Sequence, residues 1–183
     1  MKRSLQRLFY RLRQFGLAIT SRMTNDDREF ERKYLTIPEA ALFDQLPPDE
    51  QKHSVVVARR MLSLAHTPQA DVDERVIAKV GLLHDIGKSA IKLGVIDRSI
   101  LVAMRRLARP LYDKIAQVGR SETALRLSRK FYVHKEHAGI GSDLLRKANT
   151  DDKIIRIVAS HDDPPSESDP IELFLLRKVD SAN

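Results

Sequence analysis

The amino-acid sequence predicts an all-α fold, a helical bundle preceded by a basic helical extension. Apolar residues recur at intervals of three and four through most of the 183 residues, which is the period of a helix with one buried face. No segment alternates apolar and polar residues as a half-buried strand does. With 42% hydrophobic and 31% charged residues, the chain is globular in composition and long enough to bury a core.

The N-terminal part is predicted to be a basic amphipathic extension over residues 1–46. Its first helix has arginines on one face and apolar residues on the other. The apolar residues are Leu5, Leu8, Phe9, Leu12, Phe15 and Ile19. Pro47-Pro48 then interrupts the helical pattern, so the domain itself is predicted over residues 47–183.

Capping residues and prolines predict where the later helices begin and end. In the extension, Asp26 and Pro38 are expected to begin helices that reach Leu35 and Leu46. In the domain, helices are expected over residues 49–65, 71–87, 97–109, 121–132, 137–147, 151–161 and from 170 onward. Their expected starts are marked by Asp71 with Glu74, Asp97, Ser121, Thr150 or Asp151, and Asp169 before Pro170.

The composition excludes several classes of protein. There is no cysteine, so disulfides and thiolate metal sites are excluded and a reducing compartment is expected. No apolar run approaches the roughly 18–20 residues that span a bilayer. Arg7, Arg11 and Arg13 interrupt the apolar residues near the N-terminus, which argues against a secretory signal. The expected location is the cytoplasm, with peripheral contact to a membrane as the alternative.

The net charge of +7 comes from two stretches. Residues 1–25 carry six Lys/Arg and no acid, and residues 105–135 carry nine Lys/Arg against Asp113 and Glu122. Such stretches indicate an anionic surface or ligand, although solvated helix faces are the commoner explanation. Residues 1–22 could contact an anionic membrane through their arginines; alternatively, their apolar face packs on the domain. Nucleic acid is not expected as a partner, because 5% aromatic residues and no Trp leave few stacking platforms.

The stretch GLLHDIGK places His84 and Asp85 side by side at the predicted end of an apolar helix. Burying two polar groups without partners costs a few kcal/mol, so something must compensate, and a metal is one candidate. Further residues near helix ends could converge on this pair, namely His53, His134, His137, His161 and Asp180. Imidazole and carboxylate are the ligands that divalent cations take where thiolates are absent. Each residue taken alone is more commonly a structural or surface residue.

The order of these residues resembles the HD-domain metal-dependent phosphohydrolase superfamily, in particular its small stand-alone HD/HDIG-type members. The matching residues are His53 in QKHSVVVA, His84-Asp85 in GLLHDIGK, His137 in HKEHAGIGSDLL, His161 in IVASHDDP and Asp180 in LLRKVDSAN. The resemblance covers about residues 49–183, and HDIGK is its most specific motif. The chain departs from the branch that cleaves cyclic dinucleotides, because ASHDDPPSESDP stands in place of that branch's GYP-containing loop.

The resemblance implies one or two divalent metal ions, which could be Mn, Fe, Zn, Ni, Co or Mg. The ligands common to the superfamily would be His53, His84, Asp85 and Asp180. Asp85 would bridge to a second metal held by His137 and His161. Asp85 and Lys88 would be the catalytic residues, with Lys88 stabilising the phosphate charge. His134 would support the ligands or bind the substrate phosphate together with Lys88.

The implied reaction is hydrolysis of a phosphate ester or anhydride, most simply of a nucleotide, by a metal-activated hydroxide. It needs no side-chain nucleophile, in agreement with the absence of Cys and of a G-x-S-x-G motif. Phosphomonoesterase, phosphodiesterase and pyrophosphohydrolase activities all stay open. The alternative is a non-catalytic metal-binding module for signalling or interaction, located at a membrane surface if residues 1–22 bind lipid.

Overall fold

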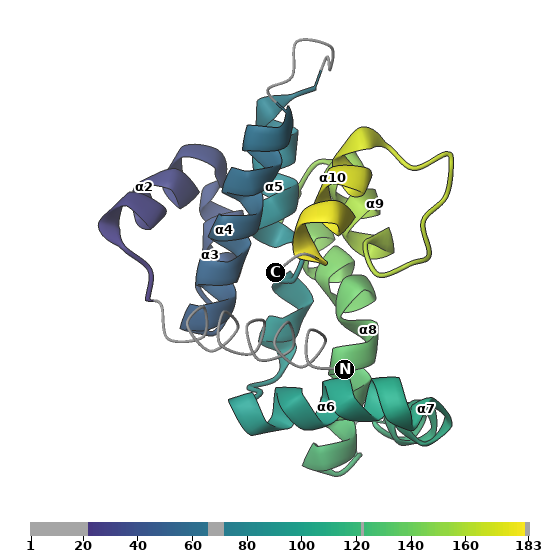
Figure 1. Ribbon diagram of the computed structural model, residues 1–183. Coiled ribbons are helices and arrows are strands. Elements are labelled where there is room, and N and C mark those ends of the chain that lie inside the picture. The colour runs from purple at the N-terminus through teal and green to yellow at the C-terminus, as the bar shows by residue number, and fades with distance from the viewer. Residues whose placement is uncertain (1–21, 66–71, 122, 182–183) are drawn as a thin grey trace, which may run out of the picture. The chain divides into compact units, whose positions relative to one another are not determined.

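The computed structural model describes residues 22–65, 72–121 and 123–181. Every regular element in these ranges is a helix, which confirms the predicted all-α fold (Figure 1). The predicted first helix of the extension, together with His66 and Asp71, lies outside the described residues. None of the described helices is both long and apolar enough to cross a bilayer.

The chain divides into two compact units. The first combines Met1–Leu83 with Asp163–Asn183, and the second is His84–Asp162. The helices of the first unit are α2 (Asn25–Tyr34), α3 (Ile37–Phe43), α4 (Pro48–Ala65), α5 (Glu74–Leu83) and α10 (Ile171–Asp180). α4 packs against both α5 and α10 (Figure 1). A Cβ on Gly81 of α5 would lie 2.5 Å from the Cα of Ala58, so the backbones of α4 and α5 are in close contact at this point.

Local hydrogen bonds set the helix starts of the first unit. α2 begins with a capping box, because the Thr24 hydroxyl accepts from the N–H of Asp27 and the Asp27 carboxylate accepts from the N–H of Thr24. The cap predicted at Asp26 is therefore wrong. The cap predicted at Asp169 is also wrong: Pro170 occupies that position, and the Asp169 carboxylate accepts from the N–H of Ser166 instead.

The second unit is arranged around one long helix. Its elements are the 3₁₀ helix η1 (Ile86–Ala90), α6 (Val95–Leu107), α7 (Arg109–Val118), α8 (Arg126–Lys147) and α9 (Asp152–Ser160). α8 contacts η1, α6, α7 and α9 (Figure 1). One apolar cluster of this unit consists of Leu93, Leu101, Tyr112, Ala116 and Phe131.

Three predicted helices are wrong in a way that matters for the site. The helix expected to end at Gly87 ends at Leu83, and a separate 3₁₀ helix follows. The two helices expected over residues 121–132 and 137–147 are the single helix α8. α8 is contacted by several elements, so its buried residues do not form the single apolar stripe by which a helix is identified from sequence.

Of the caps predicted for α6 and α9, the one at Asp97 is wrong and the one at Asp151 is confirmed. The Asp97 carboxylate accepts from the N–H of Gly94 at 2.9 Å, so Asp97 lies in the first turn of α6 and the cap position itself belongs to Gly94. Asp151 is the cap of α9, as predicted, and its carboxylate accepts from the N–H of Lys153 at 2.7 Å.

Candidate metal centre

The link between α5 and η1 positions His84 and Asp85. α5 ends at Leu83, and η1 starts at Ile86, so the two polar residues lie in the turn between the helices. Leu83, His84 and Ile86 are fully buried, and Asp85 is nearly so. A continuous α-helix would point adjacent side chains about 100° apart. The break in the helix removes that constraint from His84 and Asp85.

Two glycines hold η1 directly against α8. A Cβ on Gly87 would lie 1.9 Å from the carbonyl oxygen of His137 and 2.7 Å from the amide nitrogen of Gly141. A Cβ on Gly141 would in turn lie 3.1 Å from the amide nitrogen of Gly87. The backbones can approach this closely only because both positions lack a side chain. This contact brings Asp85 beside His137.

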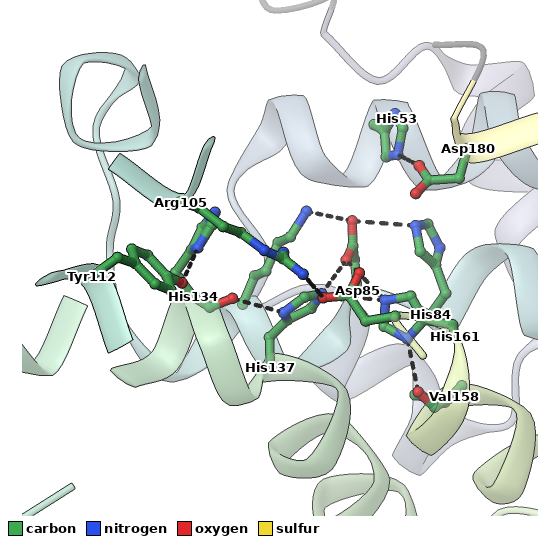
Figure 2. A network of polar contacts seen from close by, with 12 residues as sticks. His53, His84, Asp85, Arg105, Tyr112, His134, His137, Val158, His161 and Asp180 are labelled. Carbon is green, nitrogen blue, oxygen red and sulfur yellow. Dashed lines mark hydrogen bonds and ion pairs between the residues drawn. The ribbon is translucent and has the colours of Figure 1, made fainter. Parts of the chain in front are cut away.

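Asp85, His137 and His161 form a buried group that we call the ligand triad. Their nearest ligand atoms lie within 4.8 Å of one another. The Nε2 of His137 is 3.3 Å from Oδ1 of Asp85, and the Nε2 of His161 is 3.9 Å from the same oxygen. The two Nε2 atoms are 3.2 Å apart. Figure 2 shows the three side chains pointing toward one another.

Backbone carbonyls fix the orientation of both imidazoles. The Nδ1 of His137 lies 3.0 Å from the carbonyl oxygen of His134, and the Nδ1 of His161 lies 2.7 Å from that of Val158. We assign a proton to each Nδ1, because a carbonyl can only accept. Burial, with the nearby His84 and His137, lowers the pKa of His161 to about 4, so this ring is neutral near pH 7. The Nε2 of His161 then presents a lone pair to the triad, and the Nε2 of His137 does so in the neutral form of its ring.

This donor set fits a divalent cation. The two Nε2 atoms lie 3.2 Å apart, and their lone pairs, which would repel each other, would coordinate a bound cation. The carboxylate of Asp85 supplies the negative charge that such a cation needs. An imidazole whose Nδ1–H donates to a carbonyl is also the usual form of a metal-binding histidine. The triad therefore has the ligand types, orientation and burial of a metal site.

The charge of Asp85 is maintained by its neighbours. Burial acts to raise its pKa, but His84 and Lys88 outweigh burial and hold the pKa well below its usual range. The Nζ of Lys88 lies 2.5 Å from Oδ2, and the Nε2 of His84 lies 3.2 Å from the same atom. Lys88 follows Asp85 by three residues, and side chains at this spacing lie above one another in a 3₁₀ helix. Asp85 is consequently an anionic carboxylate that could bind a cation.

The other predicted ligands have different surroundings. The ring of His84 meets that of His161 edge to face, with centroids 5.6 Å apart. In the first unit, the Nε2 of His53 lies 3.0 Å from Oδ1 of Asp180 (Figure 2). The side chains of this pair are 27% and 40% exposed. Four of the six predicted ligands thus belong to the second unit, and the remaining two contact each other in the first.

The chain matches the HD domain family over residues 51–182. It belongs to the HD domain family. Proteins of this family are in general metal-dependent hydrolases that bind divalent metals, in agreement with the His and Asp side chains that could hold an ion here. The chain has no significant match among curated proteins or among solved structures.

Residues that the sequence did not indicate support the triad of this HD domain. The hydroxyl of Tyr112 lies 2.6 Å from Nδ1 of His134. Burial raises the pKa of Tyr112 to about 12 and lowers that of His134 to about 4, so both groups are neutral near pH 7. We assign the shared proton to the phenol, which is the better donor. The backbone carbonyl of His134 accepts a hydrogen bond from Nδ1 of His137. The sequence did not indicate this contact, because it does not involve the side chain of His134.

A second supporting contact lies beside His161. Both terminal nitrogens of Arg105 lie 3.2 Å from one carboxylate oxygen of Asp162. Burial acts to raise the pKa of Asp162, but His137 and Arg105 outweigh it and the pKa is lowered. The only hint in the sequence was the second acid of the ASHDD stretch. The contact places one arginine of the basic 105–135 segment beside Asp162, the residue that follows His161 of the triad.

Proposed function

We propose that this HD domain hydrolyses a phosphate ester or anhydride, with nucleotides as the substrate class, and that the ligand triad holds the required divalent cation. One observation carries the proposal: Asp85 and two imidazoles, each oriented by a backbone carbonyl, converge in a buried site. A bound divalent cation would supply polarisation of the phosphoryl group and a water molecule of lowered pKa. The chain's own residues would supply orientation and charge.

The remaining ligands are proposed from their order in the chain. By the resemblance of their order to that of the superfamily, His53, His84 and Asp180 would be the other ligands. The contact between His53 and Asp180 supports this assignment for two of them, because it already pairs an imidazole with a carboxylate. With Asp85 shared between the two sets, the domain would hold two ions. A count of bound metal per chain, with and without Asp85, tests the shared role.

Three side chains are proposed to bind the substrate. Lys88 brings a positive charge to the edge of the triad, where charge develops on a phosphoryl oxygen. His134 accepts a hydrogen bond from the Tyr112 hydroxyl at Nδ1, which leaves Nε2–H as the donor it would offer to a phosphate oxygen. Arg105 would bind a further phosphate, since its planar guanidinium suits phosphate as well as the carboxylate of Asp162. Several phosphate-binding groups favour a nucleotide over a simple monoester.

The test is a hydrolysis assay on the purified chain with Mn²⁺ or Fe²⁺. The panel should hold nucleoside mono-, di- and triphosphates, cyclic and linear dinucleotides, dinucleoside polyphosphates and a non-nucleotide phosphate ester. Asp85→Ala is the inactivating variant, and Asp143→Ala is the control, because Asp143 is exposed on the same helix as His137 and pairs only with Arg146 among the contacts described. We expect turnover in the control and none in Asp85→Ala. Equal activity in both variants would exclude the proposed site.

The same material tests the alternative of a non-catalytic module. Metal content is measured by emission spectroscopy before the assay. One bound metal per chain and no turnover of any nucleotide would favour an interaction module. Metal binding with turnover that is lost in Asp85→Ala supports the hydrolase.

A further inference from the structure

Exposed apolar side chains are concentrated in one part of the second unit. Among the described residues, eight of the twelve large apolar side chains that are exposed lie between Ile96 and Leu127. Scattered exposed apolar residues are ordinary, but a contiguous group indicates a binding surface. Most of these residues belong to α6 and α7, which follow each other along one end of the unit (Figure 1).

The exposed residues of α6 form a regular stripe. Ile96, Ile100, Ala103 and Leu107 are all exposed and follow one another at intervals of four, three and four residues. This spacing places them along one face of the helix. The opposite side of α6 carries Leu101, which is buried in the apolar cluster with Tyr112. The packing of α6 therefore does not account for the stripe, and Leu107 remains 83% exposed.

α7 continues the pattern and adds positive charge. Leu111, Lys114 and Val118 are exposed on one face of α7, at intervals of three and four residues. Arg106 on α6 is exposed as well. Neither Arg106 nor Lys114 forms a salt bridge within the described part of the chain, so their charges are available to an outside partner.

The acids of α6 and α7, Asp97 and Asp113, are already engaged. Asp97 lies 2.6 Å from the Nζ of Lys130, and Asp113 lies 2.7 Å from that of Lys135.

We call the exposed residues of α6 and α7 the α6–α7 surface. Its apolar residues are Ile96, Ile100, Val102, Leu107, Leu111 and Val118. Its basic residues are Arg106, Arg109 and Lys114. The surface is therefore apolar and positively charged.

We propose that the α6–α7 surface docks on an anionic lipid bilayer. Aliphatic side chains would enter the boundary between headgroups and acyl chains, and the basic side chains would bind lipid phosphates. The long stems of Arg106 and Lys114 allow their charged ends to remain at the headgroups while the neighbouring leucines insert. This site is distinct from residues 1–22, which were predicted to contact a membrane from sequence alone.

The observations favour lipid over three other occupants. A second copy would bring Arg106, Arg109 and Lys114 against their own like charges. Residues 1–25 of the same chain carry a charge of +6 and would be repelled for the same reason. Nucleic acid would leave the aliphatic stripe without a partner, and no large aromatic side chain of this surface is exposed for base stacking. A bilayer with anionic headgroups matches both the apolar and the charged residues.

The first test is co-sedimentation of the full chain with phosphatidylcholine vesicles, with and without about one third phosphatidylglycerol. The double variant Leu107→Gln/Leu111→Gln should lower the partition onto anionic vesicles by about tenfold or more, through the loss of inserted apolar area. Arg106→Gln/Lys114→Gln should lower it about fivefold per charge on anionic vesicles and have no effect on neutral ones. Ile37→Gln is the matched control, because Ile37 is 88% exposed but lies on α3.

The second test uses fluorescence and does not depend on a loss of binding. The chain contains no Trp, so Leu111→Trp introduces a single reporter into the α6–α7 surface. We expect its emission to shift to shorter wavelength with anionic vesicles and to be quenched by brominated acyl chains. Ile37→Trp should show neither change. This variant also decides the question if the glutamine variants prove to be unfolded by circular dichroism.

Two results would overturn the proposal. In the first, the Leu107→Gln/Leu111→Gln variant is folded and binds vesicles as strongly as the unmodified chain, and the emission of Leu111→Trp does not shift. Any lipid binding would then be assigned to residues 1–22. A dimer in lipid-free solution that Leu107→Gln dissociates would assign the surface to self-association.

Discussion

The ligand triad and the His53–Asp180 pair are predicted from sequence as one set, yet the structure holds them very differently. The triad is buried, and its ligand atoms lie within 4.8 Å of one another. The pair is joined at 3.0 Å through side chains that are 27% and 40% exposed. Burial strengthens the electrostatic interaction between a ligand and a cation, because the local dielectric is low. We therefore expect the triad to dominate metal affinity.

The triad also owes its orientation to the main chain. Each of its imidazoles contacts the carbonyl three residues earlier in the sequence, that of His134 for His137 and that of Val158 for His161. A helix thus fixes the rotamer of its own ligand. A site that is oriented before the ion arrives loses less conformational entropy on binding. The following predictions test this contrast between the triad and its surroundings, from the largest expected effect to the smallest.

Replacing the carboxylate of the triad should have the largest effect. Asp85→Asn keeps the volume of the side chain but removes its charge, so we expect hydrolysis to fall by about a thousandfold or more and metal to be lost. Asp180→Asn should cost less, about 10–100-fold, since its site is more exposed. Activity and metal content of the two variants are the measurements. A larger loss in Asp180→Asn than in Asp85→Asn would reverse the proposed ranking.

Separating η1 from α8 should have the next largest effect. A methyl group at Gly87 would overlap the carbonyl of His137, so Gly87→Ala should lower the free energy of unfolding by about 3 kcal/mol and weaken metal binding with it. Gly139→Ala is the control on α8, because a Cβ at Gly139 meets no atom within 4 Å. The control should be neutral or stabilising by up to about 1 kcal/mol. Urea unfolding measures the free energy of unfolding of both variants. Similar values for Gly87→Ala and Gly139→Ala would refute the close contact of η1 with α8.

Removing one supporting hydrogen bond should have a smaller effect. Tyr112→Phe deletes the hydroxyl that contacts His134, and we expect a loss of about 1 kcal/mol in the free energy of unfolding. It should also raise KM more than it lowers kcat, because His134 would lose its fixed tautomer for substrate binding. Tyr132→Phe is the control, since its ring faces Arg129 and would keep that contact. If KM and kcat are unchanged in Tyr112→Phe, His134 does not bind the substrate.

The smallest effect is expected for a carboxylate outside the triad. The hydrogen bond from Lys130 and the N–H of Gly94 lower the pKa of Asp97 below its ordinary value of 3.8. A carboxyl whose pKa is lower in the folded chain than in the unfolded chain stabilises the fold at pH values above its pKa in the unfolded chain. This contribution is lost as the pH falls through the pKa in the folded chain. The difference in Tm between the unmodified chain and Asp97→Asn should therefore be present at pH 7 and shrink below about pH 4. A difference that stays constant down to pH 2 would contradict this linkage.

Much of the fold could be predicted from the sequence because helical periodicity is a local property. The exceptions are informative. The end of α5 at Leu83 was not predicted, and the close contact of Gly87 with α8, which is distant in the sequence, leaves no local pattern. The continuity of α8 was missed because His134 and His137 lie among charged residues in a helix that is contacted from several sides.

Some residues of the candidate site could likewise be predicted from the sequence, and others could not. His84, Asp85, His137 and His161 could be proposed because their side chains carry the ligand chemistry and stand in a recognisable order. The carbonyl of Val158 could not be proposed, since every residue has a carbonyl and only the fold selects one. Tyr112 was hidden for a related reason: at a core position its ring looks like any buried aromatic, and its hydroxyl acquires meaning only from the proximity of His134.

The continuity of α8 has a geometric consequence. At a rise of about 1.5 Å per residue, its 22 residues extend over about 33 Å, and His137 lies about 16 Å along the axis from Arg126. An α-helix resists stretching, so this spacing is fixed, whereas two helices joined by a loop would leave it variable. A partner that immobilises the first turn of α8 would therefore also set the distance at which His137 stands from that partner.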